Sequence, residues 1–185
     1  MIDHHASPAC CDGSLDTSEK AFRDAGLNGC LCYEVSDRNN EGEGIAENER
    51  FIRKCKQSGD AQIAAMFGLH ASMTLGHATL ERCAAIGKET GAGFHVHAAE
   101  DEMDEKVTQA EFHKRVMERF RDAGITGPKS IFVHGVHLDE REREILKETG
   151  SMVVHNPESN MNNAVGAARI LCMMSRGVLV GLGTD

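Results

Sequence analysis

The sequence has 185 residues, of which 41% are apolar and 26% are charged. This is the size and composition of one soluble globular domain, and it excludes a disordered or fibrous chain. With 20 basic and 29 acidic residues the net charge is −9, which argues against nucleic acid or an anionic membrane surface as a partner. No apolar stretch approaches the ~20 residues of a membrane-spanning helix, and no signal peptide is expected.

Six glycines predict the order of the elements along the chain. Each ends a polar, helix-like stretch and precedes a short apolar run, at positions 26, 59, 91, 124, 150 and 177. A glycine just past a helix can adopt the left-handed conformation that closes the last turn. The predicted strands are residues 1–3, 30–35, 63–69, 94–96, 131–133, 152–154 and 178–182. The sequence therefore predicts seven strands joined by six helices, as βα units in series.

Three shorter segments carry local expectations. Asp16 and Glu19 offer a capping box for the first helix. Residues 39–44 are expected to form a polar loop. The acidic run at 101–105 suits the first turn of a helix, where carboxylates are stabilised by the helix dipole.

The seven cysteines show no CxxC pair and no regular framework. This spacing predicts reduced thiols in a cytoplasmic protein. A zinc site built from these cysteines is the alternative, and ordinary buried thiols are the favoured interpretation.

Polar residues follow many of the predicted strands. Histidines stand at positions 4, 5, 70, 95, 97, 134, 137 and 155, and Asp185 follows the last strand. Parallel βα units can form a doubly wound sheet or a (β/α)8 barrel, and the sheet would usually show a GxGxxG turn, which this sequence lacks after its first strand. A barrel gathers the carboxyl ends of its strands at one face, where imidazole and carboxylate can hold a divalent cation. The pattern favours an α/β barrel and a metal-assisted hydrolase.

Four ordered motifs resemble a known family. They are FHVHAAE at 94–100, VHGVHLD at 133–139, VHNPESN at 154–160 and GLGTD at 181–185. In this order they resemble strands five to eight of the amidohydrolase superfamily, in its aminohydrolase and chlorohydrolase branch. The strings DHHASP at 3–8, LCYEVSD at 31–37 and MNN at 161–163 look closer still to the SsnA-type aminohydrolases. The resemblance implies a TIM barrel of the metal-dependent hydrolase type.

The resemblance also implies a role for each matching position. His97 matches the metal ligand of the fifth strand. Glu100 matches the carboxylic acid that passes a proton to the ring or leaving nitrogen of the substrate. His134 matches the histidine that contacts the substrate and orients the attacking hydroxide or polarises the substituent on the reacting carbon. Asp185 matches the aspartate that ligates the metal and takes a proton from the bound water.

The other histidines have weaker assignments. His70 matches a substrate-binding histidine of strand four, with a core role as the alternative. His155 either contacts substrate or supports the floor of the site. His95 is expected to pack on the other face of its strand, and His137 either to be structural or to contact the residues that hold the metal. The DHH letters at 3–5 match a phosphoesterase signature whose further motifs are not found, so these side chains are expected to support the site from behind its ligands.

The family pattern also extends beyond this sequence. Its members hold their metal with a His-x-His pair at the end of strand one as well, and neither that strand nor the last helix has a counterpart in residues 1–185. His97 and Asp185 are two protein ligands, where a catalytic zinc uses three or more. Residues 1–185 are therefore expected to be a partial catalytic barrel from a longer gene product, which binds metal weakly and is inactive by itself.

The predicted reaction is hydrolysis of a carbon–nitrogen bond outside peptides, and specifically the deamination of a heterocycle or amidine by metal-bound hydroxide. One divalent ion is expected, with zinc preferred and Fe(II) accepted by the same ligands. The expected partner is a small-molecule substrate, the expected location is the cytoplasm, and assembly into a homo-oligomer is compatible with the sequence. The alternative is an inactive or non-catalytic barrel fragment that lacks the full metal site.

Overall fold

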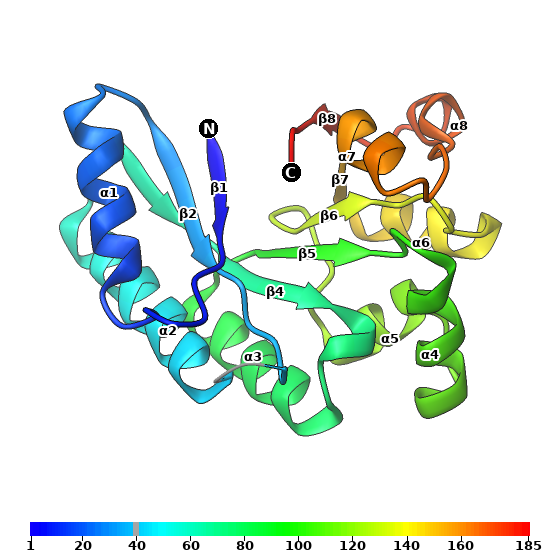
Figure 1. The fold of residues 1–185 in the computed structure, drawn as a ribbon, viewed down its shortest axis with the longest axis horizontal. Coiled ribbons are helices and arrows are strands. Elements are labelled where there is room, and N and C mark those ends of the chain that lie inside the picture. The colour runs from blue at the N-terminus through cyan, green and yellow to red at the C-terminus, as the bar shows by residue number, and fades with distance from the viewer. Residues whose placement is uncertain (39–40) are drawn as a thin grey trace. The chain divides into compact units, whose positions relative to one another are not determined.

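The computed structural model describes residues 1–38 and 41–185, in which strands and helices alternate along the chain (Figure 1). Two compact units are described separately: unit 1 is Met1–His70 with Thr74–His95, and unit 2 is Ala71–Met73 with Val96–Asp185. The elements are β1 (Ile2–His5), α1 (Ser14–Asp24), β2 (Gly29–Tyr33), α2 (Glu41–Ser58), β3 (Ile63–Ala65), β4 (Phe67–Ala71), the 3₁₀ helix η1 (Ser72–Thr74), α3 (His77–Thr90), β5 (Phe94–Ala98), α4 (Glu102–Phe112), α5 (Val116–Ala123), β6 (Ile131–His134), α6 (Glu140–Thr149), β7 (Met152–His155), α7 (Pro157–Asn162), α8 (Ile170–Ser175) and β8 (Val180–Leu182).

The six glycine stops are confirmed. All six have a positive φ between 60° and 85°, the left-handed region that a side chain disfavours. Each lies just past a helix and before the next strand. The predicted alternation of helices and strands therefore follows from where these glycines stand.

Unit 1 contains the parallel sheet β1-β2-β3, and β4 lies next to the start of β5. The run at 63–69, predicted as one strand, is divided into β3 and β4. The backbone hydrogen bonds change partner there, since the Met66 N–H donates to the Leu31 carbonyl and the Phe67 N–H to the Gly93 carbonyl. The buried side chain of Asn48 links β2 to β4. Its Oδ1 accepts from the backbone N–H groups of Tyr33 and Gly68, at 3.0 and 3.2 Å, and its Nδ2 donates to the Tyr33 carbonyl at 2.7 Å. Gly68 is required there, because a Cβ would lie 2.3 Å from the Tyr33 oxygen.

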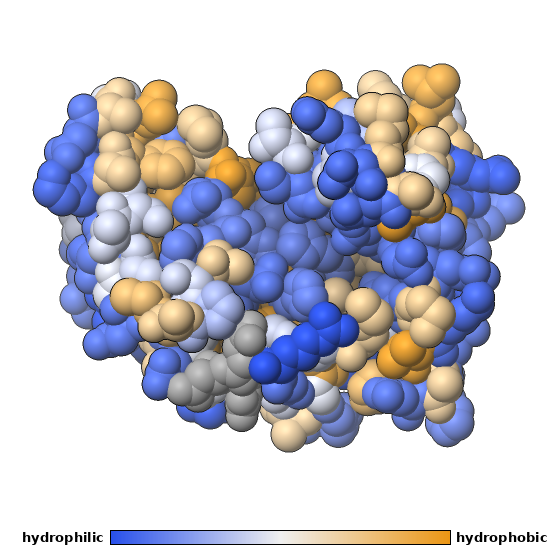
Figure 2. All heavy atoms as spheres, viewed as in Figure 1, coloured by the Kyte–Doolittle hydropathy of each residue, from blue (hydrophilic) through white to orange (hydrophobic). Residues whose placement is uncertain are grey.

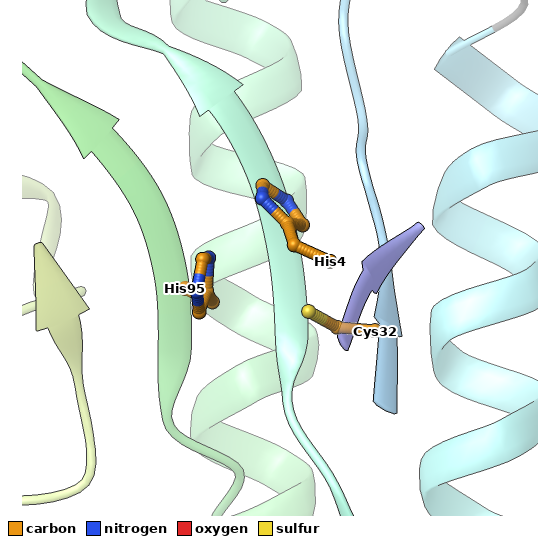
Figure 3. A group of neighbouring side chains, drawn as sticks. All are labelled: His4, Cys32 and His95. Carbon is orange, nitrogen blue, oxygen red and sulfur yellow. The ribbon is translucent and has the colours of Figure 1, made fainter. Parts of the chain in front are cut away.

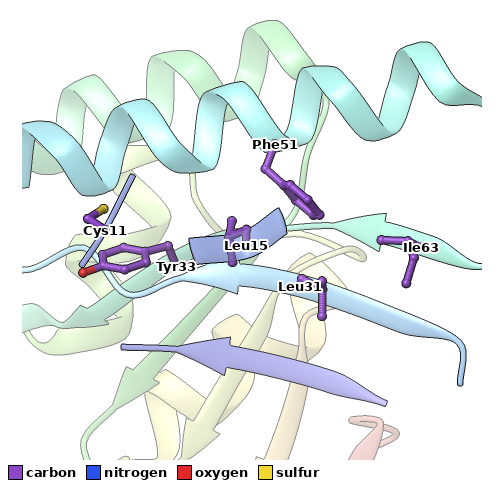
Figure 4. Close-up of a cluster of buried hydrophobic side chains, with 6 residues drawn as sticks. All are labelled: Cys11, Leu15, Leu31, Tyr33, Phe51 and Ile63. Atoms are coloured by element: carbon purple, nitrogen blue, oxygen red, sulfur yellow. The ribbon is translucent and has the colours of Figure 1, made fainter. Parts of the chain in front are cut away.

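The hydrophobic core of unit 1 lies between β2 and its helices (Figure 4). Leu31 and Tyr33 are two residues apart on β2, so their side chains lie on the same face of the strand. Leu15 of α1 and Phe51 of α2 pack on that face and are at most 1% exposed. The full cluster is Cys11, Leu15, Leu31, Tyr33, Phe51 and Ile63.

Two local expectations in unit 1 are wrong. Helix α1 begins at Ser14, so Asp16 cannot cap it and instead pairs with Lys54 at 2.5 Å. The cap comes from the buried carboxylate of Glu47, which accepts from the backbone N–H of Leu15 at 3.0 Å. The polar loop expected at 39–44 is helical from residue 41 onward, and residues 39–40 lie outside the described part of the chain.

Unit 2 contains the end of β5 followed in the sheet by β6, β7 and β8, and the pairs β6–β7 and β7–β8 are parallel. The expected helix start in the acidic run is confirmed, since Asp101 caps α4 by accepting from the Met103 N–H at 2.7 Å. The predicted single helix after β5 is two helices, because His113 adopts φ 56° and ends α4. The connection after β7 likewise contains both α7 and α8.

Unit 2 also exposes large apolar side chains around α8 (Figure 2). Leu171 and Met174 of α8 are 81% and 55% exposed, and Leu182 of β8 is 80% exposed. Among the described residues, no helix is both long enough and apolar enough to cross a membrane.

Candidate active site

Three side chains of unit 2 meet beyond the ends of parallel strands. His97 stands near the end of β5, His134 ends β6, and Asp185 follows β8 by three residues. The Nε2 atom of His97 lies 3.8 Å from Asp185 Oδ1, and Nε2 of His134 lies 3.7 Å from Asp185 Oδ2. The candidate ligand atoms of all three residues lie within 4.8 Å of one another. This cluster is called the His–His–Asp site below.

Glu100 joins this site through a tight turn after β5. Its Oε2 lies 3.5 Å from His134 Nε2. The turn requires φ 49° at Ala99, and hydrogen bonds on both sides hold that conformation. The Ala99 N–H donates to Asp104 Oδ2 at 2.9 Å, and the Ala99 carbonyl accepts from the His137 N–H at 2.9 Å. Burial raises the pKa of Asp104, although its two backbone donors oppose the shift.

His134 is held in one orientation. The residue is 1% exposed and has φ 70°. Its Nδ1 lies 2.8 Å from Oδ1 of Asn160. An amide oxygen can only accept, so Nδ1 carries the hydrogen and Nε2 presents its lone pair toward Asp185 and Glu100. This tautomer is the one that a metal or a substrate proton requires.

Helix α7 and Asn163, the residue that follows it, support three members of the site with three polar side chains. Asn160 fixes His134, Ser159 Oγ donates to Asp185 Oδ2, and Asn163 Nδ2 donates to Glu100 Oε1 at 3.0 Å. Sequence reasoning assigned no role to these three side chains. The signal was present in the polar string that follows β7, but only the fold shows which residue each one contacts.

The remaining predicted residues make other contacts. His70 lies in unit 1, where its Nδ1 is 2.9 Å from Thr74 Oγ1. His155 ends β7, and its buried Nδ1 has no hydrogen-bond partner among the described residues. His137 contacts the Val165 carbonyl through Nε2 at 3.0 Å, a structural contact of the kind expected. His95 is 8% exposed and packs against His4, with ring centroids 4.3 Å apart.

The donor spacing of the His–His–Asp site fits a divalent ion. Bonds of about 2.0–2.2 Å in a tetrahedral site place neighbouring donors about 3.3–3.6 Å apart. The separations of 3.7 and 3.8 Å here are only slightly larger. Nitrogen and oxygen donors suit zinc and Fe(II). His97 and Asp185 were the two ligands expected, and the structure adds His134 Nε2 as a third donor within reach.

Comparison with solved structures gives the fold. A guanine deaminase from C. acetobutylicum matches with TM-score 0.87 and 15% identity, over 100% of this chain and 46% of that one. An adenosine deaminase from Xanthomonas campestris with bound zinc matches with TM-score 0.85 and 24% identity, over 92% of this chain and 39% of that one. The predicted fold class is therefore confirmed as the α/β barrel type of the amidohydrolases.

The amidohydrolase family model matches residues 2–185, and the chain belongs to this family. A 5-methylthioadenosine/S-adenosylhomocysteine deaminase from Desulfitobacterium hafniense is 35% identical over 100% of this chain and 42% of its own length. A 5'-deoxyadenosine deaminase from Methanosarcina mazei is 33% identical over 92% of this chain and 40% of its own length. The chain thus spans about two fifths of these curated relatives. The narrower likeness to SsnA-type aminohydrolases stays a prediction.

Proposed function

We propose that this chain is the catalytic-barrel portion of a metal-dependent deaminase, which replaces the exocyclic amino group of a nitrogen heterocycle with oxygen and releases ammonia. The observation that carries the proposal is the convergence of His97, Glu100, His134 and Asp185 in unit 2. The two relatives named above act, by their names, on adenosine derivatives. Adenine nucleosides altered at the 5' position are therefore the first substrates to test.

The metal-holding residues in this proposal are His97 and Asp185, with His134 as a neighbouring donor. When bound, a zinc or Fe(II) ion supplies Lewis acidity, which makes hydroxide available from water near neutral pH. The nitrogen and oxygen donors do not choose between the two metals. Both ions accept imidazole and carboxylate ligands.

Different side chains of the protein carry out the separate proton transfers of deamination. Water adds to the ring carbon that bears the amino group, and ammonia leaves from the same carbon. Asp185 has one oxygen facing each histidine and is placed to accept a proton from the attacking water. Glu100 keeps Oε2 toward the site while Asn163 holds Oε1, so it can deliver a proton to the ring nitrogen and then to the departing amine. His134 orients the attacking oxygen through Nε2.

His70 and His155 are proposed as substrate contacts. The proposal for His155 is supported by its buried Nδ1, which has no hydrogen-bond partner among the described residues and is available to a bound heterocycle.

We also propose a cytoplasmic location, which is supported by seven cysteines that all lack a disulfide. A homo-oligomer stays a prediction.

Ammonia release by the full-length, metal-loaded protein tests the function. The panel contains 5'-deoxyadenosine, 5-methylthioadenosine, guanine, cytosine and an amidine. We expect release from at least one heterocyclic amine, and loss of that release in Asp185→Asn. Turnover of none of these compounds by a protein with stoichiometric metal would contradict the proposal.

A further inference from the structure

A second group of metal-ligating side chains lies within unit 1. His4 comes from β1, Cys32 from β2 and His95 from β5, and their candidate ligand atoms lie within 4.8 Å of one another. Figure 3 shows the three side chains directed toward a common space. Nothing in the proposed deamination uses this group, and it is called the His–Cys–His group below.

The strand register explains why His4 and Cys32 meet. In the parallel pair β1–β2, His4 is the direct partner of Cys32, so the two side chains lie on the same face of the sheet. Leu31 and Tyr33, the neighbours of Cys32 along β2, belong to the helix-facing core. Cys32 therefore points to the opposite face, where the rings of His4 and His95 lie with centroids 4.3 Å apart.

Burial distinguishes this thiol from an ordinary reactive cysteine. Cys32 is 0% exposed and His95 is 8% exposed. Desolvation raises the pKa of the Cys32 thiol well above its ordinary value, so the thiol is neutral at physiological pH and not poised for nucleophilic or redox chemistry. A cation with two imidazole ligands beside it would supply the positive charge that a buried thiolate requires.

We propose that His4, Cys32 and His95 form a metal site for a borderline-soft transition-metal ion of the Zn²⁺ type, bound by two imidazole nitrogens and one thiolate. Sulfur distinguishes this site from the His–His–Asp site, whose donors are only nitrogen and oxygen. Zinc–ligand bonds of about 2.0–2.3 Å require these donors to approach to about 3.5 Å of one another. His4 is the least buried of the three and has the most room to make that adjustment.

Cobalt(II) binding to the full-length apoprotein tests this site, because thiolate-bound Co²⁺ absorbs in the near ultraviolet by sulfur-to-metal charge transfer. Co²⁺ at the His–His–Asp site gives no such band, since that site has no sulfur ligand. We expect the wild-type protein to develop the band to saturation on titration with Co²⁺ and to lose it on addition of Zn²⁺. Absence of the band from the wild type at saturating Co²⁺ would overturn the proposal.

Variants assign the band to its ligands. Cys32→Ser is expected to remove it. Cys30→Ser is the matched control, two residues away on the same strand and outside the group, and it should retain the full band. If Cys32→Ser fails to fold, His4→Gln serves instead and should weaken Co²⁺ binding in this band by more than about tenfold. A band unchanged in a folded Cys32→Ser or His4→Gln protein would contradict the site.

Discussion

Replacement of Asn160 by alanine tests whether α7 positions the active-site histidine. Asn160 is 1% exposed, and its Oδ1 is the acceptor for Nδ1 of His134 at 2.8 Å. In Asn160→Ala the N–H of His134 is left buried without that acceptor, which should cost about 1–3 kcal/mol of unfolding free energy. The ring also loses its fixed tautomer, and removal of such partners lowers metal affinity or activity by about 10–100-fold.

The assay is a chelator-competition titration of zinc with the full-length protein, followed by thermal unfolding. Asn162→Ala is the matched control, since Asn162 is exposed on the same helix. Asn160→Asp keeps an oxygen acceptor and should recover metal affinity relative to Asn160→Ala. If Asn160→Ala binds zinc and unfolds as Asn162→Ala does, the support that we assign to α7 is wrong.

Three further predictions concern other side chains. Ser159→Ala should free Asp185 and lower kcat about tenfold with little change in Tm, because this hydrogen bond lies near the surface; an unchanged kcat would refute it. Glu100→Gln should reduce ammonia release about 10²–10⁴-fold while metal content, measured by elemental analysis, stays at the wild-type level; loss of the metal would instead indicate a ligand role. Burial, and then the charge of Glu142, raises the pKa of Glu105 to about 9 from its ordinary value of 4.5. The folded state therefore binds the Glu105 proton more tightly, so this group's stabilising contribution is complete below about pH 4.5 and is lost as the pH rises toward 9. Glu105→Gln should flatten that part of the pH dependence in urea unfolding, and an unchanged slope would count against the assignment.

The sequence predicts the features that depend on local chemistry. A glycine that ends a helix can be recognised from the sequence alone, and all six such positions have the expected positive φ. The sequence also predicts site residues at the ends of β5 and β6. His97 and His134 lie at the ends of short apolar segments, and such segments predict parallel strands whose carboxyl ends meet at one edge of the sheet. The fold class and four members of the site follow from these two patterns together with the family resemblance.

Contacts between distant segments could not be read from the sequence. Glu47 caps α1 from another helix, and Asn48 links β2 to β4, although neither residue stands near its partner in the chain. The role of Asn160 depends on how α7 meets the end of β6. Likewise, no spacing rule brings His4 beside Cys32, because that proximity depends on the register of β1 on β2.

The central claim is that His97 and Asp185 hold the ion at which deamination takes place. Anomalous X-ray diffraction from crystals of the full-length, catalytically active protein tests it most directly. We predict an anomalous peak at about 2.0–2.2 Å from His97 Nε2 and from a carboxylate oxygen of Asp185, in a protein that releases ammonia. An active protein that shows no ion at these two residues would contradict the account.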